Sequence, residues 1–587
     1  MTAEHSAPNW LRYLAAEDPL PPTNLAWPLR GAGFAWLGVD GASVAEPLPA
    51  CKPDEILVRV DAVSLCSSDA KMIRLGDRYP LFYGRDLHKA PTRLGHEVAL
   101  TVVQVGATWQ HRYVRGQRLG LQPDVFNGGK RTCFGVLIPG GLAEYVALGP
   151  DVLHGDAGSY VFPVPASLGY ADVALLEPWA CVDAAYAPRR RLDPRPGGTL
   201  LLVGRPDDST PYELARPLPS RKVLVSGVPP TLAALLRREG VEIFDLEGPD
   251  WQAAVTELGL AGAVDDIILL NFRNSEAVEA ASRLLAPGGT LTLVGDSPLG
   301  RPAALDVGRI HYEFISYLGC RGPQIDAAFG PERNRSELRR GGVTWIAGAG
   351  GPMGRMHVQR ALQLADGPRA VFATNRGAAR LAELAETFGP LAQARGKEFF
   401  AVNPEAEPQR FAGLCRELTG GRGFDDVVVV AADLALMQQA VDSLAPDGML
   451  ALFGGLPLGS MLPLPVDNVS RYGAQFTGTS GSALADQQRV VARTLAGELA
   501  PAHSVAAIGG LDAAAQGLQA VAERRFAGKI VLFPHLPGLP LLGLDELAEA
   551  LPGVHACLEP GGTWCAAAEQ ALFEHYLAGH TKENPHA

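Results

Sequence analysis

The sequence lacks the features that mark several large classes of protein. No apolar run approaches the roughly 18 residues of a membrane-spanning helix. The N-terminus MTAEHSAPNW has no basic segment followed by an apolar core, so we expect neither a membrane protein nor a secretory signal. The 51 Lys and Arg residues are outnumbered by 63 Asp and Glu, and the net charge is -12 without any basic tract. Because polyanion binding relies on clustered basic side chains, we expect no nucleic-acid partner.

Cysteine is also sparse. The 8 cysteines are scattered over 587 residues without a paired framework, which predicts a reduced, cytoplasmic protein. A chain of this length is expected to form several compact units. Its 47% hydrophobic content can bury substantial cores, and its 67 Gly and 47 Pro suit many short strands and turns better than a helical bundle.

What the sequence does contain is an internal repeat. VDDIILLNF (264–272) resembles FDDVVVVAA (424–432), LAPGGTLTLVGDSPLG (285–300) resembles LAPDGMLALFGGLPLG (444–459), and ISYLGCRG (315–322) lines up with QFTGTSGS (475–482). The offset within each pair is 159 or 160 residues. Three matches in the same order at one offset indicate a duplication.

Each copy alternates apolar strands with helical segments. Strands are predicted at 199–204, 222–227, 241–246, 266–272, 290–295 and 314–319 in the first copy, and at 343–348, 369–374, 398–403, 425–431, 448–454 and 474–479 in the second. Nearly continuous apolar strands joined through helices indicate a parallel sheet covered on both faces. The sequence therefore predicts two tandem doubly wound (Rossmann-like) domains, at 191–335 and 336–500.

The copies differ at the turn after their first strand. The second continues as GAGGPMG into a helical segment, whereas the first continues as RPDDSTPYELARPLPS, whose prolines interrupt a helix and whose Asp207 and Asp208 repel a pyrophosphate. A pyrophosphate needs close backbone approach and a free helix N-terminus. We expect only the second copy to bind a dinucleotide, the alternative being an ordinary strand-to-helix connection. The predicted contacts are Gly348, Gly350, Gly351, Pro352, Met353 and Gly354.

The end of the next strand bears on the choice of cofactor. An acidic residue there would bind the ribose 2'-hydroxyl of NAD and repel the 2'-phosphate of NADP. This chain has Thr374, Asn375 and Arg376, with Arg380 one turn later. The set favours NADP over NAD; the alternative is that both arginines are solvated surface charges.

Metal-binding residue types occur in the N-terminal third. Cys66 follows the apolar strand EILVRVDAV, His96 and Glu97 begin another strand, and Glu177 begins a helix. Thiolate, imidazole and carboxylate are the ligands of catalytic zinc, and three of them leave one position open. Taken singly, each residue also has an ordinary role, as a core thiol, a strand-end histidine or a helix N-terminal charge.

In combination with a dinucleotide domain, these residues resemble the zinc-dependent medium-chain dehydrogenase/reductase superfamily. The resemblance covers roughly 25–190 and 340–535 and rests on CSSD (66–69), GHE (95–97), GGLAEYV (140–146), EPWACV (177–182) and GKIVLFP (528–534). The EPWACV form is typical of the polyol branch that includes sorbitol dehydrogenase. GAGGPMGRMHVQRAL is similar to the L-sorbose-1-phosphate reductase group in particular.

The resemblance implies a GroES-like catalytic domain at 1–190, completed by a return of the chain within 501–587. It implies one catalytic zinc held by Cys66, His96 and Glu97. Glu177 would be a direct or water-mediated fourth partner, and Cys181 is a weaker candidate.

Further roles follow from the same resemblance. Ser68 would relay the substrate proton, and Asp69 would order the loop that carries it. Relatives with a structural zinc carry four cysteines after the catalytic histidine. This chain has only Cys133 between His96 and Glu177, so we expect no structural zinc. Ordinary members also lack the first doubly wound copy.

The implied activity is hydride transfer between NAD(P) and a secondary alcohol or ketone, with a polyol or sugar phosphate as the expected substrate. Two alternatives stay open: a zinc-independent NADP reductase on the same scaffold, and a non-enzymatic nucleotide-binding scaffold. Basic residues between the metal motifs either hold a substrate phosphate or form a solvated loop face. They are Arg74, Arg78, Arg85, His88, Lys89 and Arg93.

Three interpretations remain for 191–335. We favour a decayed copy that fills space or forms an oligomer interface, over a regulatory ligand site or a substrate lid. A homo-oligomer, dimeric or tetrameric, is expected. Near the C-terminus, LDELAEALPGVHACL and AAAEQALFEHYLAGH predict two amphipathic helices.

Overall fold

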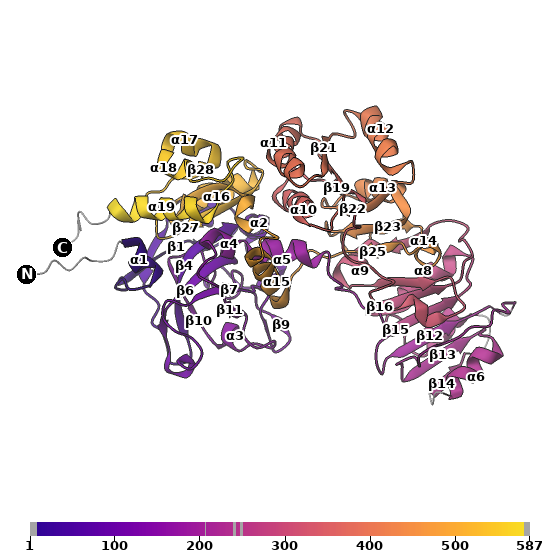
Figure 1. The fold of residues 1–587 in the computed structure, drawn as a ribbon. Helices are drawn as coiled ribbons and strands as arrows, with labels where there is room; N and C mark the ends of the chain where they lie inside the picture. Colours follow the sequence, from indigo (N-terminus) through magenta and orange to yellow (C-terminus); the bar gives the residue numbers. More distant parts are fainter. Residues whose placement is uncertain (1–8, 206, 239–241, 247–249, 580–587) are drawn as a thin grey trace, which may run out of the picture. The chain divides into compact units, whose positions relative to one another are not determined.

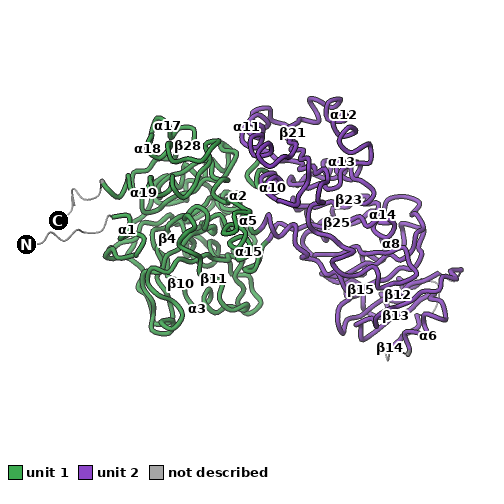
Figure 2. The backbone as a smooth tube through the Cα atoms, in the orientation of Figure 1, with its two compact units in different colours: residues 1–180, 351–356, 482–587 green, residues 181–350, 357–481 purple. Residues whose placement is uncertain are grey.

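A computed structural model of the chain describes residues 9–205, 207–238, 242–246 and 250–579. Residues 1–8 lie outside this range, and they include most of the N-terminal segment MTAEHSAPNW. Val241, in the strand predicted at 241–246, also lies outside it. The chain forms two compact units: 1–180, 351–356 and 482–587 make up the first, and 181–350 and 357–481 the second (Figure 2). None of the described helices is both long enough and apolar enough to cross a membrane. The domain boundaries drawn from the sequence at 190, 335 and 500 stay predictions.

The first unit is built on an eight-stranded sheet. Its order is β11 (Val161–Pro163), β7 (Arg118–Leu121), β6 (Glu97–Val105), β4 (Ile56–Leu65), β27 (Lys529–Phe533), β26 (Val505–Gly510) and β28 (Leu542–Gly543), with β10 (Tyr145–Leu148) also on β4. Short ladders join β1 (Thr23–Ala26) to β3 (Val44–Pro47), β2 (Pro28–Leu29) to β5 (Thr92–Arg93) and β8 (Phe126–Asn127) to β9 (Lys130–Arg131).

Short helices complete the first unit. They are α1 (Asn9–Leu14), α2 (Ser67–Leu75), α3 (Pro150–Leu153), α4 (Tyr170–Ala174), α15 (Leu484–Leu495), α16 (Ala514–Ala522) and α19 (Ala566–Gly579), and α5 (Leu176–Ala184) begins here. Every residue of β4 is buried, and its two charged side chains, Arg59 and Asp61, form a buried ion pair at 2.7 Å. β27 pairs with β4, so the late GKIVLFP segment completes the GroES-like sheet as expected.

The C-terminal region departs from the sequence prediction. The first expected helix is broken into α17 (Leu547–Ala550) and α18 (Pro552–His555). Leu551, between them, adopts φ -140° and ψ 67°. Proline lacks a backbone N–H and disfavours helical geometry in the residue before it, so Pro552 ends one helix and begins the next. The second predicted helix is present as α19, and His580 of its sequence lies outside the described residues.

The second unit contains two six-stranded parallel sheets with the same strand order (Figure 1). The first is β14 (Glu242–Asp245), β13 (Lys222–Ser226), β12 (Thr199–Val203), β15 (Val264–Leu270), β16 (Leu285–Val294) and β18 (Ser316–Cys320). The second is β21 (Glu398–Val402), β20 (Ala370–Thr374), β19 (Val343–Ala347), β22 (Phe424–Val429), β23 (Leu444–Leu452) and β25 (Gln475–Thr477). This order, 3-2-1-4-5-6 in each copy, is that of the doubly wound dinucleotide fold. The predicted fold class is therefore confirmed.

Helices connect these strands. In the first copy they are α6 (Pro230–Arg238), α7 (Trp251–Glu257), α8 (Ser275–Leu284) and α9 (Val307–Tyr312). In the second they are α10 (Pro352–Gln363), α11 (Ala378–Ala394), α12 (Pro408–Thr419), α13 (Leu434–Asp442) and α14 (Asp467–Tyr472). The first copy has no helix among its described residues between β12 and β13, as its prolines predict. Pro206 of that segment is not among the described residues.

The strand registers refine the alignment of the two copies. Asp266 lies opposite Thr290 in the first sheet, and Asp426 lies opposite Met449 in the second. Thr290 also lies opposite Ser316, as Met449 does opposite Gln475. The offset is therefore 426 − 266 = 160 at the fourth strand and 475 − 316 = 159 at the last. The sequence alignment of the last segment was wrong by one residue.

Candidate metal and nucleotide sites

Neighbouring strand ends bring the predicted metal ligands together. β4 and β6 run antiparallel with Ser64 opposite Glu97. Cys66 follows the end of β4, and His96 precedes the start of β6. One ligand atom from each of Cys66, His96 and Glu97 lies within 4.8 Å of the others. Since the chain leaves one strand where it enters its antiparallel neighbour, residues about 30 positions apart in sequence meet at one sheet end.

Asp69 holds the two ligand-bearing loops in place. Its Oδ2 accepts a hydrogen bond from the backbone N–H of Cys66 at 3.0 Å, which caps helix α2. Its Oδ1 lies 3.2 Å from Nδ1 of His96 and accepts a bond from the N–H of Gly95 at 3.4 Å. A carboxylate on one ring nitrogen of a histidine orients the other nitrogen toward a metal. Ser68 Oγ lies 3.3 Å from that other nitrogen, Nε2.

The glycines before and beyond His96 allow close packing. Gly95 has φ +87°, and a Cβ there would lie 2.9 Å from a methyl carbon of Val63. A Cβ on Gly140 would lie only 2.4 Å from the carbonyl oxygen of Leu94. Gly141 donates its N–H to the carbonyl of Gly95 at 2.7 Å. The GGLAEYV motif thus packs its backbone directly against the histidine loop, which explains its glycines.

Glu97 is held by a lysine that the sequence analysis did not single out. Lys529 Nζ lies 2.6 Å from Glu97 Oε1, and both side chains are buried. The other oxygen, Oε2, is buried and has no hydrogen-bond partner among the residues that the structure describes. A buried acceptor without a partner is costly, and a cation beside Cys66 and His96 would satisfy it. The donor set therefore fits a zinc ion.

The signal for Lys529 was present in the motif GKIVLFP. β27 pairs with β4 so that Ile530 lies opposite Leu65, and Lys529 therefore lies beside the end of β4. The motif was used only to predict a returning strand. Only the pairing of β27 with β4 shows that Lys529, at the start of the motif, lies beside Glu97.

The charges at this site shift several pKa values. Burial alone would lower the pKa of His96, but attraction to Asp69 outweighs it and raises that pKa well above its ordinary value. Burial would raise the pKa of Asp69, but the charge of His96 and its hydrogen bond lower it. Burial, reinforced by repulsion from Glu97, raises the pKa of Glu177 to about 7.

Glu177 lies in the first turn of α5, as predicted. It is electrostatically coupled to Glu97, His96 and Lys529. Its carboxylate is not part of the three-residue group whose ligand atoms lie within 4.8 Å of one another, and neither is the thiol of Cys181. Its role as a fourth partner therefore stays a prediction.

The glycine turn has the backbone that its sequence requires. It joins β19 to α10, with Gly348 at φ +84°. A Cβ on Gly350 would lie 2.6 Å from Cγ of Asn375, which brings the turn against the end of β20. Gly351 is different, because a Cβ there would meet no atom within 4 Å. The fold therefore explains glycine at 348 and 350 but places no steric demand for glycine at 351.

The residues expected to select NADP are polar and accessible. Arg376 forms an ion pair with Glu405 at 2.8 Å, in which the arginine is 73% exposed. Arg380 lies 3.2 Å from Glu383, one turn along the same helix. The exposed Arg376 pair contributes little, so this guanidinium is able to exchange partners, whereas the Arg380 side chain is only 21% exposed. Thr374, by contrast, accepts a hydrogen bond from Trp345 inside the core.

Most basic residues between the metal motifs have structural partners. Arg85 donates to the carbonyl oxygens of Ala90, Pro91 and Leu137. Arg93 pairs with Glu46 at 3.1 Å. Lys89 and His88 contact Asp86 and Trp36, respectively. These contacts favour a structural role for the loop over a phosphate site.

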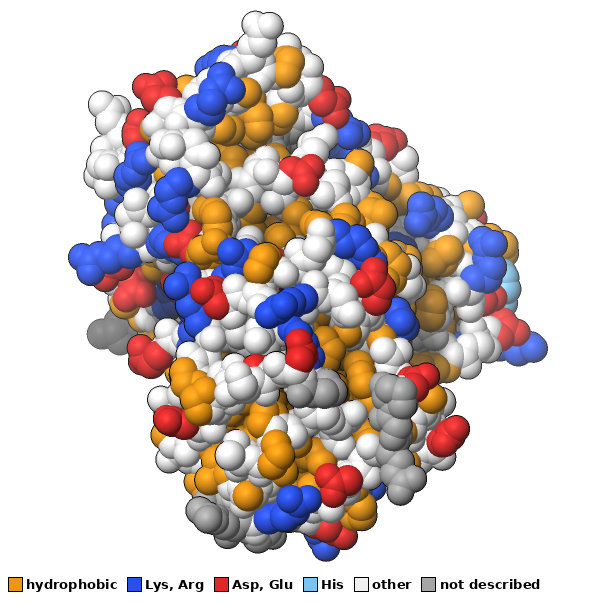
Figure 3. All heavy atoms as spheres, turned by 90° about the vertical axis from the view of Figure 1, so that its right-hand side faces the viewer, with side chains coloured by type: hydrophobic (Ala, Val, Ile, Leu, Met, Phe, Trp, Pro, Cys, Tyr) orange, Lys and Arg blue, Asp and Glu red, His pale blue; other side chains and the backbone are white. Residues whose placement is uncertain are grey.

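The carboxyl edge of the first sheet carries a cavity of about 310 Å³, lined by Thr210, Tyr212, Asn271, Gly295, Asp296, Ser297 and Arg321. Its polar groups largely satisfy one another. Ser297 donates to Asn271 at 2.8 Å, and Tyr212 donates to Asp208 at 2.5 Å. On the face shown in Figure 3, basic and acidic side chains are interspersed. These features identify no ligand for this edge.

Comparison with known proteins finds similarity to alcohol and polyol dehydrogenases. Residues 52–155 match the model of the alcohol dehydrogenase GroES-like domain. This match assigns that segment to the alcohol dehydrogenase GroES-like domain family, which is consistent with the medium-chain dehydrogenase/reductase superfamily. It is 29% identical over 307 residues to L-sorbose 1-phosphate reductase of Klebsiella pneumoniae, covering 48% of this chain and 72% of that one. It is 26% identical over 281 residues to sorbitol dehydrogenase of Bacillus subtilis, covering 44% and 74%.

Mannitol-1-phosphate 5-dehydrogenase of Aliivibrio fischeri is 30% identical over 250 residues, which cover 41% of this chain and only 58% of the relative. Among solved structures, 2R,3R-butanediol dehydrogenase of Bacillus subtilis aligns with 87% of this chain and 100% of its own, at 15% identity and a TM-score of 0.47. That TM-score is too low to add to the assignment. The named relatives are dehydrogenases and reductases of polyols and sugar phosphates, which supports an oxidoreductase activity for this chain.

Proposed function

We propose that this protein is a zinc-dependent oxidoreductase that transfers a hydride between NADP and a secondary alcohol or ketone of the polyol or sugar-phosphate class. One observation carries the proposal: a thiol, an imidazole and a carboxylate lie within 4.8 Å of one another, and the carboxylate keeps one buried oxygen without a partner among the described residues. That donor set is typical of catalytic zinc and leaves a position for substrate.

When bound, zinc would act as a Lewis acid on the substrate oxygen, and the nicotinamide would give or accept the hydride. The chain's own residues supply orientation and proton transfer. Asp69 holds His96 through Nδ1 at 3.2 Å, which leaves Nε2 for the metal. The Ser68 hydroxyl lies 3.3 Å from Nε2, which supports a role in passing the substrate proton. Lys529 balances the charge of Glu97.

The nucleotide part of the proposal depends on the second sheet. Its strand order reverses between β19 and β22. Doubly wound folds bind dinucleotides at such a reversal, at the carboxyl ends of the strands. The turn at Gly348 leads into helix α10, whose N-terminus favours a pyrophosphate. Arg376 and Arg380 favour NADP over NAD.

The proposal is tested by metal analysis together with a substrate panel of polyols, sugar phosphates and simple alcohols, each with NAD and NADP. We expect about one zinc per chain and turnover of at least one secondary alcohol with NADP. Cys66→Ser should lose zinc and turnover while still binding NADPH. Cys51→Ser, which alters another half-buried thiol of the same unit, should retain both.

Two outcomes would favour the alternatives. Turnover by a chain stripped of metal would indicate a zinc-independent reductase on the same scaffold. Binding of zinc and nucleotide without turnover of any alcohol or ketone would indicate a non-enzymatic scaffold. A further variant, Ser68→Ala, should keep zinc and lower turnover by about 10²–10⁴-fold if the hydroxyl relays the proton.

A further inference from the structure

The two copies pair with each other through equivalent strands. β17 (Ala303–Asp306) of the first copy runs antiparallel to β24 (Met461–Leu464) of the second. Ala303 lies opposite Leu464, Ala304 opposite Pro463, and Leu305 opposite Leu462. Neither strand belongs to one of the six-stranded sheets, so this ladder joins one copy to the other.

The register of this ladder is symmetric. With the offset of 159, Ala303 corresponds to 462, Ala304 to 463, and Leu305 to 464. Ala303 therefore contacts the equivalent of Leu305, and Leu305 contacts the equivalent of Ala303. At the centre, Ala304 lies opposite its own equivalent, Pro463. A contact in which i meets j and j meets i is the signature of a twofold, isologous interface between identical subunits.

A second, independent pair of contacts obeys the same symmetry. A Cβ on Gly319 would lie 2.6 Å from the carbonyl oxygen of Leu293 and 2.9 Å from Cα of Ser470. A Cβ on its equivalent, Gly478, would lie 2.8 Å from the carbonyl oxygen of Leu452 and 3.4 Å from Cα of His311. Adding 159 to 319, 293 and 311 gives 478, 452 and 470. The lack of a side chain at each glycine thus allows the equivalent helix of the other copy to pack closely against it.

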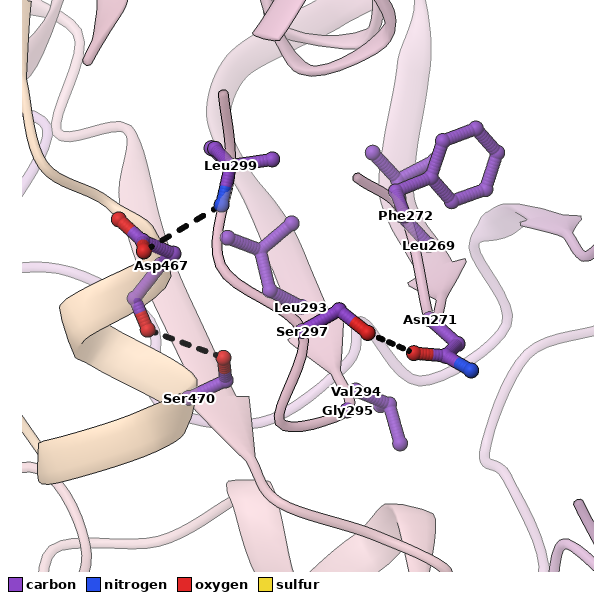
Figure 4. A pocket seen from close by; sticks show the side chains of 10 residues that line it. All are labelled: Leu269, Asn271, Phe272, Leu293, Val294, Gly295, Ser297, Leu299, Asp467 and Ser470. Atoms are coloured by element: carbon purple, nitrogen blue, oxygen red, sulfur yellow. Dashed lines mark hydrogen bonds between the residues drawn. The ribbon is translucent and has the colours of Figure 1, made fainter. Parts of the chain in front are cut away.

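Polar contacts reinforce both sides of the interface. Asp306 Oδ2 accepts a hydrogen bond from the N–H of Gly459 at 2.7 Å. On the other side, Asp467 Oδ2 accepts one from the N–H of Leu299 at 3.4 Å. Figure 4 shows Asp467 and Ser470 of α14 beside Leu293 and Leu299 of the first copy. The small cavity between them, about 10 Å³, has room for about one water molecule.

The apolar core continues across the interface. One cluster of buried side chains includes Leu201 and Val264 of the first sheet, and Trp345 and Phe424 of the second. Leu305 and Leu462, which face each other in the ladder, belong to the same cluster and are each 1% exposed. The two copies therefore share one core.

We propose that the first copy takes the place of a second subunit. It closes a dimer-type interface of the cofactor-binding copy within the same chain, so that this edge cannot pair with another molecule. The pattern of divergence agrees with this role. The similar segments of the first copy at 285–300 and 315–322 flank β17 and α9 and include the interface residues Leu299 and Gly319, whereas the turn after the first strand has diverged. An interface between the copies requires the similar segments to be retained, but it does not require the turn after the first strand.

Engineered cysteines at the centre of the ladder test the proposal. Opposed residues in an antiparallel ladder have Cα atoms about 4.5 or 5.5 Å apart, within disulfide range. In the Ala304→Cys, Pro463→Cys double variant, mild oxidation should form an internal disulfide, seen as a linked peptide by mass spectrometry in a species of 62.0 kDa. A covalent dimer through this pair, or no linkage between 304 and 463, would overturn the proposal.

The single variant Pro463→Cys is the sharper control. If the second copies of two chains met through this edge, the twofold axis would place the two introduced thiols opposite each other, and a covalent dimer would form. The proposal predicts none above the level of the unmodified protein. Both positions lie at the surface or half-buried, so the variants should fold, and retained hydrogen-exchange protection of β23 confirms that they do.

Discussion

The buried pair of Lys529 and Glu97 shows how a single residue supports the proposed metal site. Lys529 is 4% exposed, and Glu97 is 1% exposed. Burial alone would lower the pKa of Lys529, but Glu97 and Cys66 raise it above its ordinary value. The lysine therefore stays charged, and its removal would leave a buried carboxylate without compensation.

We expect Lys529→Met to destabilise the zinc-free first unit by about 3–5 kcal/mol, since breaking a buried pair leaves one charge unpaired. Hydrogen exchange of the β4 amides measures this loss. Lys529→Arg should retain most of the stability because it keeps the charge. Added zinc should restore part of the protection in the methionine variant. Equal protection in Lys529→Met and the unmodified chain would contradict this account.

A second residue, His535, makes stability depend on pH. Burial and the nearby charge of Arg59 lower the pKa of His535 to about 4. Its Nε2 lies 3.0 Å from the carbonyl oxygen of Glu144. The unfolded chain binds a proton below about pH 6.5, whereas the folded chain does not until about pH 4. The stability contributed by the neutral side chain is therefore present above pH 6.5 and falls as the pH decreases.

The expected loss is about 1.4 kcal/mol per pH unit, or about 3 kcal/mol in total between these values. His535→Gln keeps a donor for the Glu144 carbonyl and does not titrate. The difference in unfolding midpoint between the two proteins should thus change steadily from pH 7 to pH 4.5. A constant difference over that range would show that His535 does not remain neutral.

Among the secondary-structure elements, the turn between β19 and α10 separates the demands of folding from those of binding. Gly348 and Gly350 are explained by a positive φ and by contact with Asn375. A methyl group at Gly351 would meet no atom within 4 Å, so alanine fits the fold there. Under the proposed function, glycine at 351 serves the close approach of a pyrophosphate.

We expect Gly351→Ala to leave stability unchanged and to weaken NADPH binding by at least about tenfold, or 1.4 kcal/mol. Fluorescence titration with NADPH measures the affinity. Gly413→Ala provides a matched control, because that glycine also has no atom within 4 Å and lies in helix α12. If Gly351→Ala bound NADPH normally, the turn would not be the pyrophosphate site.

Elements with a continuous pattern could be predicted from the sequence, and interrupted ones could not. The central strands of both doubly wound copies were predicted because a continuous apolar run must be buried on both faces. The helix at 544–558 was wrong because the apolar period continues through Pro552, whose backbone restriction overrides it. The one-residue error at 315–322 could have been avoided, because the offset of 159 aligns Gly319 with Gly478 and Gly322 with Gly481, whereas the offset of 160 aligns no identical residue.

For the whole molecule, the shared core of the two copies has a thermodynamic consequence. Leu462 lies in the cluster that spans both sheets, whereas Leu236 lies in a cluster made of first-copy residues only. Leu462→Ala should cost about 2–5 kcal/mol, and β16 and β23 should lose hydrogen-exchange protection together. Leu236→Ala should affect the first sheet alone. Independent behaviour of the two sheets in Leu462→Ala would contradict a common core.

The sequence by itself determined the duplicated sheets and the residue types of the candidate metal site, because periodicity and motif spacing are local properties. It named Cys66, His96 and Glu97, but only the strand pairing brought Lys529 to them, since that contact joins residues more than 400 positions apart. The role of the first copy was likewise undecided by its sequence. The register of β17 against β24 supports the proposal that the first copy replaces a second subunit, because a twofold contact depends on two surfaces that only the folded chain brings together.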